Sequence, residues 1–194
     1  SFMQDSSYNI DILGRHKSHK LAFLQVLREQ NYFQNGEAYY ERCFERQALG
    51  ELDIVLAWKG VPGEDDCQVV GYALLNWKPK YGFFKSMEFP EIQDLNVRKN
   101  YRQRGFATQL ITHCENVAME KKCSHMGISV GLTRDYGPAQ RLYFKLGYQP
   151  DGHGVTYDRK SVSHGDFKPI DDDLCLMMVK GLLGEKVNRH CEPS

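Results

Sequence analysis

The sequence predicts a mixed α/β fold with about seven strands and about four helices, and three observations carry this prediction. The length of 194 residues suits one domain with a single core. Strand-like and helix-like segments alternate only in the second half of the chain, as expected of a mixed sheet. No repeat, low-complexity run or linker divides the chain. We therefore expect one domain over residues 1–194, with its core at about 8–183, a C-terminal tail at 184–194 and a cloning scar at 1–2.

A strand and two helices are expected at the start of the chain. Polar and apolar residues alternate over 8–13, which predicts the strand. Helices are expected over 18–30 and 37–49. Three leucines share one face of the first helix: Leu21, Leu24 and Leu27.

Three strands follow. The segments 54–58 and 69–77 are rich in β-branched and aromatic residues. Between them lies a turn over 60–66 that contains Pro62 and Gly63, so an antiparallel hairpin is expected. The next strand is predicted over 91–97.

The apolar period changes in the second half of the chain. Residues 106–120 repeat apolar side chains at spacings of three and four, which predicts an amphipathic helix. A strand is expected over 127–132. Pro138 then opens a short helix that Gly147 closes. Two late strands are predicted: 148–157 and 173–179.

Composition excludes several classes of protein. The 25 Lys and Arg residues balance 25 Asp and Glu residues, so no global field exists to hold nucleic acid or an anionic membrane. The sequence contains neither a membrane-spanning apolar run nor a secretory signal, and we expect a cytoplasmic protein. Six cysteines without CxxC and seven histidines without HExxH predict neither a disulfide framework nor a metal site.

The most informative segment runs from a predicted strand into the amphipathic helix over 97–107. Four cations lie close together there: Arg98, Lys99, Arg102 and Arg104. Gly105 and Ala107 allow a tight turn, and the helix start presents unpaired N–H groups and positive dipole charge. Such a corner binds phosphate, although a solvated basic loop is the alternative. The segment is neither a Walker loop nor a GxGxxG fingerprint.

Two motifs in the second half of the chain resemble those of the GNAT family of N-acetyltransferases. The segment 102–107, RQRGFA, matches the family's R/Q-x-x-G-x-G/A signature, and 92–97 resembles its fourth strand. The segment 139–148, AQRLYFKLGY, is similar to the family's A-x-x-L-Y-x-x-x-G-F/Y element. The resemblance implies a mostly antiparallel central sheet and an acetyl-CoA site.

The resemblance also assigns residues to acetyl-CoA. The backbone of Leu95, Asn96 and Val97 would pair with the pantetheine arm, and the N–H groups of 103–108 would hold the pyrophosphate. Tyr136 replaces the family's usual asparagine and would stack beside the arm. The full set of expected contacts is Leu95, Asn96, Val97, Arg102, Gln103, Arg104, Gly105, Phe106, Ala107, Thr108 and Tyr136.

Tyr143 occupies the position of the family's general acid, which protonates the departing thiolate. A packing role is the alternative, because Tyr143 shares a helical stripe with Ala139, Leu142 and Leu146.

The general base is harder to place, because Gln93 stands where the family often carries glutamate, and glutamine accepts no proton. Glu91 lies on the same face and is the expected substitute. Asp94 points to the other face of a regular strand unless a bulge re-aims it. A solvated surface carboxylate is the alternative for both.

The resemblance therefore implies an acyltransferase that moves an acetyl group from acetyl-CoA to a primary amine by direct attack in a ternary complex. The expected acceptor is a small-molecule amine or a protein amine. A second copy of the chain, in a homodimer, is a further possible partner. Aromatic and acidic residues in the second helix and the late loop would suit a cationic amine: Tyr39, Tyr40, Glu41, Phe44, His153, Asp158, His164, Asp166, Phe167, Asp171, Asp172 and Asp173. The alternative function is a non-catalytic acyl-CoA-binding or sensing module.

Overall fold

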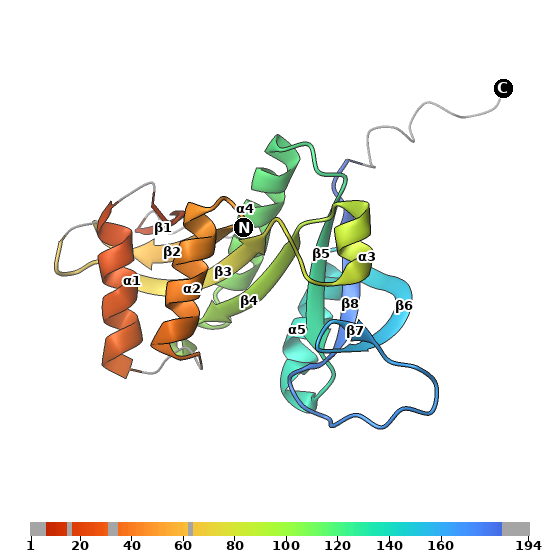
Figure 1. Ribbon diagram of the computed structural model, residues 1–194. Helices are drawn as coiled ribbons and strands as arrows, with labels where there is room; N and C mark the ends of the chain where they lie inside the picture. The colour runs from red at the N-terminus through yellow and green to blue at the C-terminus, as the bar shows by residue number, and fades with distance from the viewer. Residues whose placement is uncertain (1–6, 15–16, 31–34, 62–63, 184–194) are drawn as a thin grey trace. The chain divides into compact units, whose positions relative to one another are not determined.

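The computed structural model describes residues 7–14, 17–30, 35–61 and 64–183. Eight strands and five α-helices lie within them (Figure 1): β1 Tyr8–Ile12, α1 Lys17–Gln30, α2 Glu37–Ala48, β2 Leu52–Lys59, β3 Gln68–Asn76, α3 Gly82–Met87, β4 Glu91–Val97, α4 Phe106–Glu120, β5 His125–Gly131, α5 Gly137–Lys145, β6 Gln149–Tyr157, β7 Lys160–Ser161 and β8 Leu174–Gly181. The strands form a mixed, mostly antiparallel sheet in the order β1-β2-β3-β4-β5-β8-β6-β7. The predicted fold class is confirmed.

The chain divides into two compact units. The first consists of Ser1–Asn76 and Asp94–Cys114, and the second of Trp77–Gln93 and Glu115–Ser194. β4 and α4 contribute residues to both units. One domain over 1–194 stays a prediction. The expected scar at 1–2 and the tail at 184–194 lie outside the described residues.

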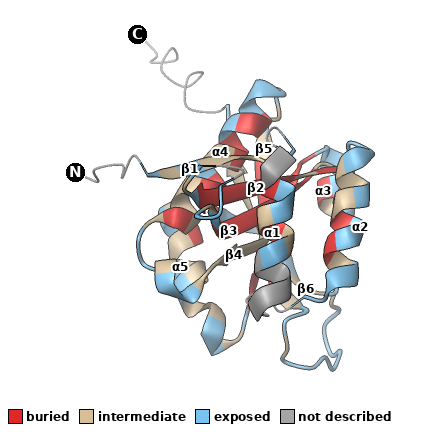
Figure 2. Cartoon of the chain, turned by 90° about the vertical axis from the view of Figure 1, so that its left-hand side faces the viewer, coloured by how far each residue is buried: buried red, intermediate tan, exposed pale blue. Residues whose placement is uncertain are grey.

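An antiparallel hairpin of β2 and β3 forms the centre of the first unit, as predicted. Its turn residues Pro62 and Gly63 lie outside the described residues. β2 is buried on both faces over Ile54–Trp58, because its alternate side chains all find apolar neighbours. Helices α1 and α2 run over β2 and β3 (Figure 1), and buried residues gather on these strands in Figure 2. This layer holds one hydrophobic core.

The apolar face of α1 differs from the predicted one at Leu21, whereas Leu24 is half-buried and the side chain of Leu27 lies outside the described residues. Leu21 is 71% exposed, whereas Phe23 is fully buried. Phe23 packs edge-on against Tyr40 and Tyr72, with ring centroids 5.6 and 5.4 Å apart. The aromatic ring buries more area than a leucine, and it sets the helix rotation that leaves Leu21 in solvent.

The second half of β4 lies beside β3 in the first unit. The Arg98 backbone N–H donates to the Val70 carbonyl at 2.9 Å. A Cβ atom on Gly71 would lie 2.6 Å from the Asn96 carbonyl oxygen, so this approach requires glycine. Asp94 has a φ of 52°, which breaks the regular strand alternation at this point.

The second unit is built on β5, β8, β6 and β7. β8 pairs antiparallel with β5 and with β6, while β4 pairs parallel with β5 through Glu91 and Ile92. A core of aromatic and sulfur-containing side chains lies here: Tyr81, Phe84, Phe89, Cys175 and Met177. Phe84 packs on the backbone of Gly127, because any Cβ there would collide with its ring.

One α-helix and one strand of the described residues were not predicted. α3 has only six residues, Gly82–Met87, and no side-chain cap at its N-terminus, so neither periodicity nor capping marks it in the sequence. β7 has two residues and exists only through its pairing with β6. All the helices and strands that were predicted are confirmed, with ends that differ by up to two residues.

No helix in the described part of the chain is long and apolar enough to cross a membrane. Among the same residues, no group of His, Cys, Asp and Glu side chains is arranged to hold a metal ion.

Candidate functional site

The corner between β4 and α4 has the backbone geometry of an anion site. Gln103 and Gly105 have left-handed φ values of 62° and 83°. No backbone N–H from Gln103 to Thr108 donates a hydrogen bond within the described residues, and the first helical bond runs from Gln109 to the Gly105 carbonyl at 3.0 Å. Unpaired N–H groups at a turn and a helix start attract an anion. The corner therefore has the geometry to bind an anion such as a diphosphate.

The four cations of this corner differ in their partners. Arg98 donates to the Val69 carbonyl at 3.2 Å, and Arg102 donates to the Val97 carbonyl at 3.1 Å. The guanidinium of Arg104 stacks over the Tyr101 ring, 5.5 Å from its centroid. Arg102 and Arg104 are both exposed. Two of the cations thus brace the turn against β3 and β4, and Arg104 keeps its N–H groups for solvent or a ligand.

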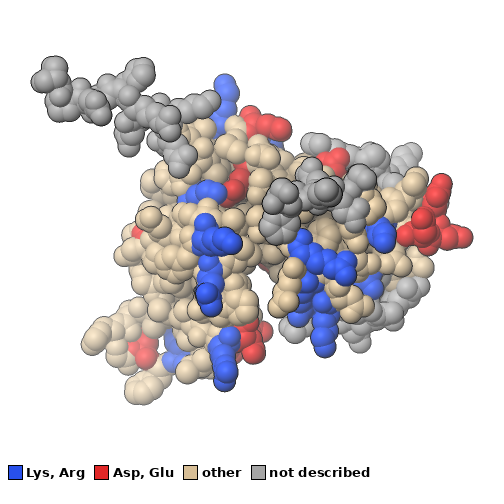
Figure 3. All heavy atoms as spheres, turned by 180° about the vertical axis from the view of Figure 1, so that it is seen from behind, with Lys and Arg blue, Asp and Glu red and all other residues tan. Residues whose placement is uncertain are grey.

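Lys and Arg side chains do not form one continuous basic patch on the face drawn in Figure 3. On the face drawn in Figure 3, Lys and Arg form separate groups with other residues between them. A local anion site fits this distribution, because each group is small.

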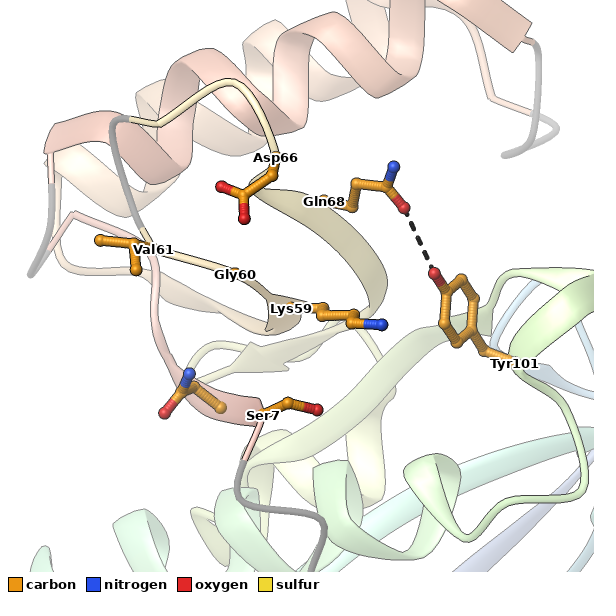
Figure 4. Close-up of a pocket in the computed structure, with 8 residues that line it drawn as sticks. Ser7, Lys59, Gly60, Val61, Asp66, Gln68 and Tyr101 are labelled. Atoms are coloured by element: carbon orange, nitrogen blue, oxygen red, sulfur yellow. Dashed lines mark hydrogen bonds between the residues drawn. The ribbon is translucent and has the colours of Figure 1, made fainter.

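A cavity of about 560 Å³ lies beside the corner in the first unit. Figure 4 shows the residues that line it: Ser7, Asn9, Lys59, Gly60, Val61, Asp66, Gln68 and Tyr101. The Tyr101 hydroxyl donates to Gln68 Oε1 at 3.2 Å across one side. None of the residues expected to contact acetyl-CoA lines this cavity.

Phe106 begins α4 and is 4% exposed. Its ring packs edge-on against Tyr8 at a centroid distance of 4.9 Å and against Tyr101 at 6.2 Å. The side chain anchors the helix start to β1, while its backbone N–H belongs to the anion corner. Ala107 and Thr108 follow in the first helical turn and are half-buried.

Leu95, Asn96 and Val97 are half-buried in β4. The side chain of Asn96 turns back along the strand, where its Nδ2 donates to Asp94 Oδ1 and to the Asp94 carbonyl, both at 3.0 Å. Asn96 therefore stabilises the irregular backbone around Asp94. Asp94, Tyr72 and Asn35 form a polar cluster with it that sequence patterning did not reveal.

Glu91 lies in the second unit and is fully buried. Its Oε2 accepts from Gln93 Nε2 and pairs with Arg159 Nη2 at 3.4 Å. Its Oε1 accepts no hydrogen bond from the described residues. Burial raises the pKa of Glu91, although Arg159 and Gln93 partly oppose this shift. Such a carboxylate has one oxygen held in place and a raised proton affinity, which is what a base near neutral pH needs.

No sequence motif marks Arg159 as a site residue. It lies in the turn between β6 and β7 with a φ of 61°, and it also donates to Ser129 Oγ at 3.2 Å. No short motif links Arg159 to Glu91, so only the pairing of β6, β8 and β5 brings them together.

Tyr143 is 6% exposed on α5, with its ring 6.3 Å from that of Tyr148. Burial raises its pKa to about 12, so the hydroxyl keeps its proton at neutral pH. This hydroxyl makes no hydrogen bond among the described residues. A buried phenol with a proton to donate is suited to a general acid. Packing and chemistry are therefore compatible at this position.

Tyr136 lies just before α5. Its ring rests on Gly131, where an added Cβ would approach ring carbons to 2.3 Å. Its hydroxyl donates to Asp172 Oδ1 at 2.7 Å. The acidic late loop is thus tied to the start of α5 through this residue.

Comparison with known proteins agrees with these motifs. A family model described as "Acetyltransferase (GNAT) family" matches residues 21–148. No curated protein sequence matches the chain.

Solved structures of similar fold are numerous. An acetyltransferase from Streptococcus agalactiae is 14% identical, with a TM-score of 0.59 over 91% of this chain and 99% of that one. A spermidine N-acetyltransferase chimera from Vibrio cholerae and hSSAT is 13% identical, with a TM-score of 0.60 over 91% and 96% of the two chains. An acetyltransferase of the GNAT family from Staphylococcus aureus is 15% identical, with a TM-score of 0.54 over 90% and 99%. At these identities the similarity shows the fold.

Proposed function

Because the chain belongs to the acetyltransferase (GNAT) family, whose co-substrate is an acyl-CoA, we propose that it transfers an acetyl group from acetyl-CoA to a primary amine. The single observation that carries the proposal is the anion corner at 103–108. Its unpaired N–H groups and left-handed turns suit a diphosphate, and the family signature RQRGFA spans it.

Each part of the cofactor has a proposed partner in this chain. The backbone of Leu95, Asn96 and Val97 pairs with the pantetheine amides, since an amide removed from water needs a partner. Gln103 to Thr108, with Arg102 and Arg104, hold the pyrophosphate. Acetyl-CoA supplies an activated acyl group as a thioester.

Two side chains of the second unit handle protons in the proposed reaction. The base accepts the proton that the amine loses. We assign this role to Glu91 Oε1, because it accepts no hydrogen bond from the described residues. The acid returns a proton to the sulfur that leaves, and the Tyr143 hydroxyl carries one at neutral pH. The amine thereby attacks in its neutral form and the thiol leaves in its neutral form.

One observation favours a second candidate function, the binding or sensing of an acyl-CoA without turnover. Gln93 stands at the position where the family often carries its base, and the expected substitute, Glu91, is paired with Arg159. In that case the anion corner binds the cofactor and no amine is acetylated.

A thermal shift tests the cofactor, and thiol release tests turnover. At about 100 times its dissociation constant, a ligand that binds only the folded state stabilises it by about 2.7 kcal/mol. We expect such a shift with acetyl-CoA, and CoA thiol release that depends on an added amine. Slow release without dependence on any amine would favour the sensing module, and the absence of a shift in folded, ligand-free protein would remove the acyl-CoA site.

A further inference from the structure

Asp94 has an unusual surrounding for a carboxylate in a β-strand. Its φ of 52° turns it out of the regular strand alternation. The Tyr72 hydroxyl donates to its Oδ2 at 2.5 Å, and Asn35 Nδ2 donates to the same oxygen at 3.2 Å. Asn96 Nδ2 donates to Oδ1 at 3.0 Å. The side chain is half-buried and stays in contact with solvent.

The hydrogen bonds between side chains around Asp94 all have its carboxylate as the final acceptor. Tyr72 has a single hydroxyl proton, and an ionised carboxylate only accepts. Because that proton goes to Asp94, the 3.0 Å bond between Tyr40 and Tyr72 has Tyr40 as its donor. Tyr40 and Tyr72 are buried, so the phenols are fixed in place. The whole network therefore delivers hydrogen bonds to one anion.

The described residues that donate to this carboxylate, Tyr72, Asn35 and Asn96, are all uncharged. No Lys, Arg or His in the described part of the chain forms an ion pair with Asp94. Two buried carboxylates differ, since Glu91 is paired with Arg159 and Glu115 with Lys180. The negative charge of Asp94 is thus held in position, and no described residue neutralises it through an ion pair.

Aromatic rings lie around the same carboxylate. Tyr39 is half-buried on α2, its ring 5.3 Å from that of Tyr40, and the charge of Asp94 acts on its hydroxyl. Burial and the charge of Asp94 raise the pKa of Tyr39 and of Tyr72, so both stay protonated. A fixed carboxylate beside tyrosine rings is the usual surrounding of a bound ammonium.

The position of Asp94 in the strand decides which ammonium it suits. The three residues that follow it are those proposed to pair with the pantetheine arm, so its Cα lies about 10 Å or less from theirs. A carboxylate stabilises the charged form of an amine, whereas the attacking amine must be neutral. Asp94 is therefore suited to an ammonium that does not react.

We propose that Asp94, with Tyr39 and Tyr72, binds the non-reacting ammonium of an acceptor that carries two or more amines, so that diamines are acetylated in preference to monoamines. The inference rests on the proposed acetyltransferase function. It makes Asp94 a specificity-determining residue and leaves proton transfer to other groups.

The test compares a straight-chain alkyl diamine with the monoamine of equal length, at fixed acetyl-CoA. Wild-type protein is expected to have a kcat/KM at least about tenfold higher for the diamine, because hydrogen bonds to charged groups contribute at this level. Asp94→Asn is expected to lower the diamine kcat/KM by about 10- to 100-fold, chiefly through KM, and to lower the monoamine kcat/KM much less, so that the diamine preference is lost. Asp11→Asn, which changes a half-buried carboxylate of β1, is the matched control and should leave both unchanged.

Asp94→Glu keeps the charge and lengthens the side chain by one methylene. It is expected to retain the diamine preference with a shifted optimum of chain length, and it serves as the second variant if Asp94→Asn fails to fold. Calorimetric titration of the diamine without acetyl-CoA gives a readout independent of turnover. Wild-type protein is expected to bind the diamine, and Asp94→Asn is expected to lose that binding.

Two results overturn the inference while leaving the acetyltransferase in place. One is equal kcat/KM for both amines in an active wild-type protein. The other is an Asp94→Asn variant that loses activity equally with both amines and recovers at high pH, which would make Asp94 a proton acceptor for the reacting amine. Diamine binding that depends on Asp94 without any acetylation would instead overturn the proposed function and retain the ammonium site.

Discussion

Arg159 and Glu91 form an ion pair of 3.4 Å although they lie 68 residues apart in the chain. The pair buries a carboxylate that is fully inaccessible to solvent, while the arginine stays partly exposed. Two donors occupy one carboxylate oxygen, and the other accepts no hydrogen bond from the described residues.

Glu91→Gln tests that oxygen through the pH dependence of turnover. The rate of the wild-type protein is expected to rise with pH through the raised pKa of Glu91, because only the ionised carboxylate accepts a proton. The variant should be slowest relative to wild type at neutral pH and lose less at high pH, where free amine is abundant. A parallel pH–rate profile of kcat for the two proteins would exclude Glu91 as the base.

The same substitution predicts a change in the pH dependence of stability. Between the ordinary pKa of glutamate and the raised pKa of Glu91, the folded state binds more protons than the unfolded state. The free energy of unfolding of wild-type protein therefore falls as pH rises through this window. In Glu91→Gln that fall should be smaller, as measured by urea unfolding at several pH values. An unchanged dependence of the free energy of unfolding on pH would mean that the ion pair with Arg159 cancels the effect of burial on the pKa of Glu91.

Tyr143→Phe keeps the buried ring and removes the hydroxyl. We expect the thermal shift with acetyl-CoA to persist and kcat to fall by about 100- to 10,000-fold, the usual loss for a general acid. Tyr8→Phe, which removes a hydroxyl from β1, is the matched control and should turn over normally. A Tyr143→Phe variant as active as wild type, with chemistry limiting the rate, would assign Tyr143 to packing.

Gly105→Val places a β-branched side chain at a φ of 83° in the anion corner. The acetyl-CoA thermal shift should disappear, because the turn that directs its N–H groups at the pyrophosphate is lost. Gly82→Val, at a position with open space around it, is the control for general destabilisation. An undiminished shift in Gly105→Val would place the pyrophosphate elsewhere.

Gly71→Ala adds a Cβ that would lie 2.6 Å from the Asn96 carbonyl. Since the colliding atom belongs to the backbone of β4, we expect the strands to move and stability to fall by about 1–3 kcal/mol. Acetyl-CoA affinity should also fall, because Asn96 belongs to the strand proposed to pair with pantetheine. Gly82→Ala has nothing within 4 Å of its new Cβ and should change neither quantity.

Local patterns predicted the elements that carry strong local signals. α4 follows its apolar period over fifteen residues, and α5 begins at a Gly-Pro pair and ends before Gly147 with a φ of 97°. The anion corner was predicted for the same reason, since its glycine and its cations lie within one short segment.

Contacts between distant segments set the rest of the site. Strand alternation placed Asp94 on the opposite face from Glu91, but a left-handed φ turns Asp94 toward Tyr72 and Asn35. Burial of Glu91 follows from its pairing with β5 and from Arg159, neither of which a local motif encodes. The rotation of α1 depends on where Phe23 meets Tyr40 and Tyr72, which three spaced leucines do not reveal.

Acetyl transfer to an amine is tested most directly by following the acetyl group itself. Acetyl-CoA with a stable-isotope label in its acetyl group is incubated with the protein and an alkyl diamine, and the products are identified by mass spectrometry. We expect labelled amide on the diamine, with one CoA thiol released for each amide formed. Label found only in free acetate, or labelled acetyl-CoA left intact in the presence of folded protein, would contradict this expectation.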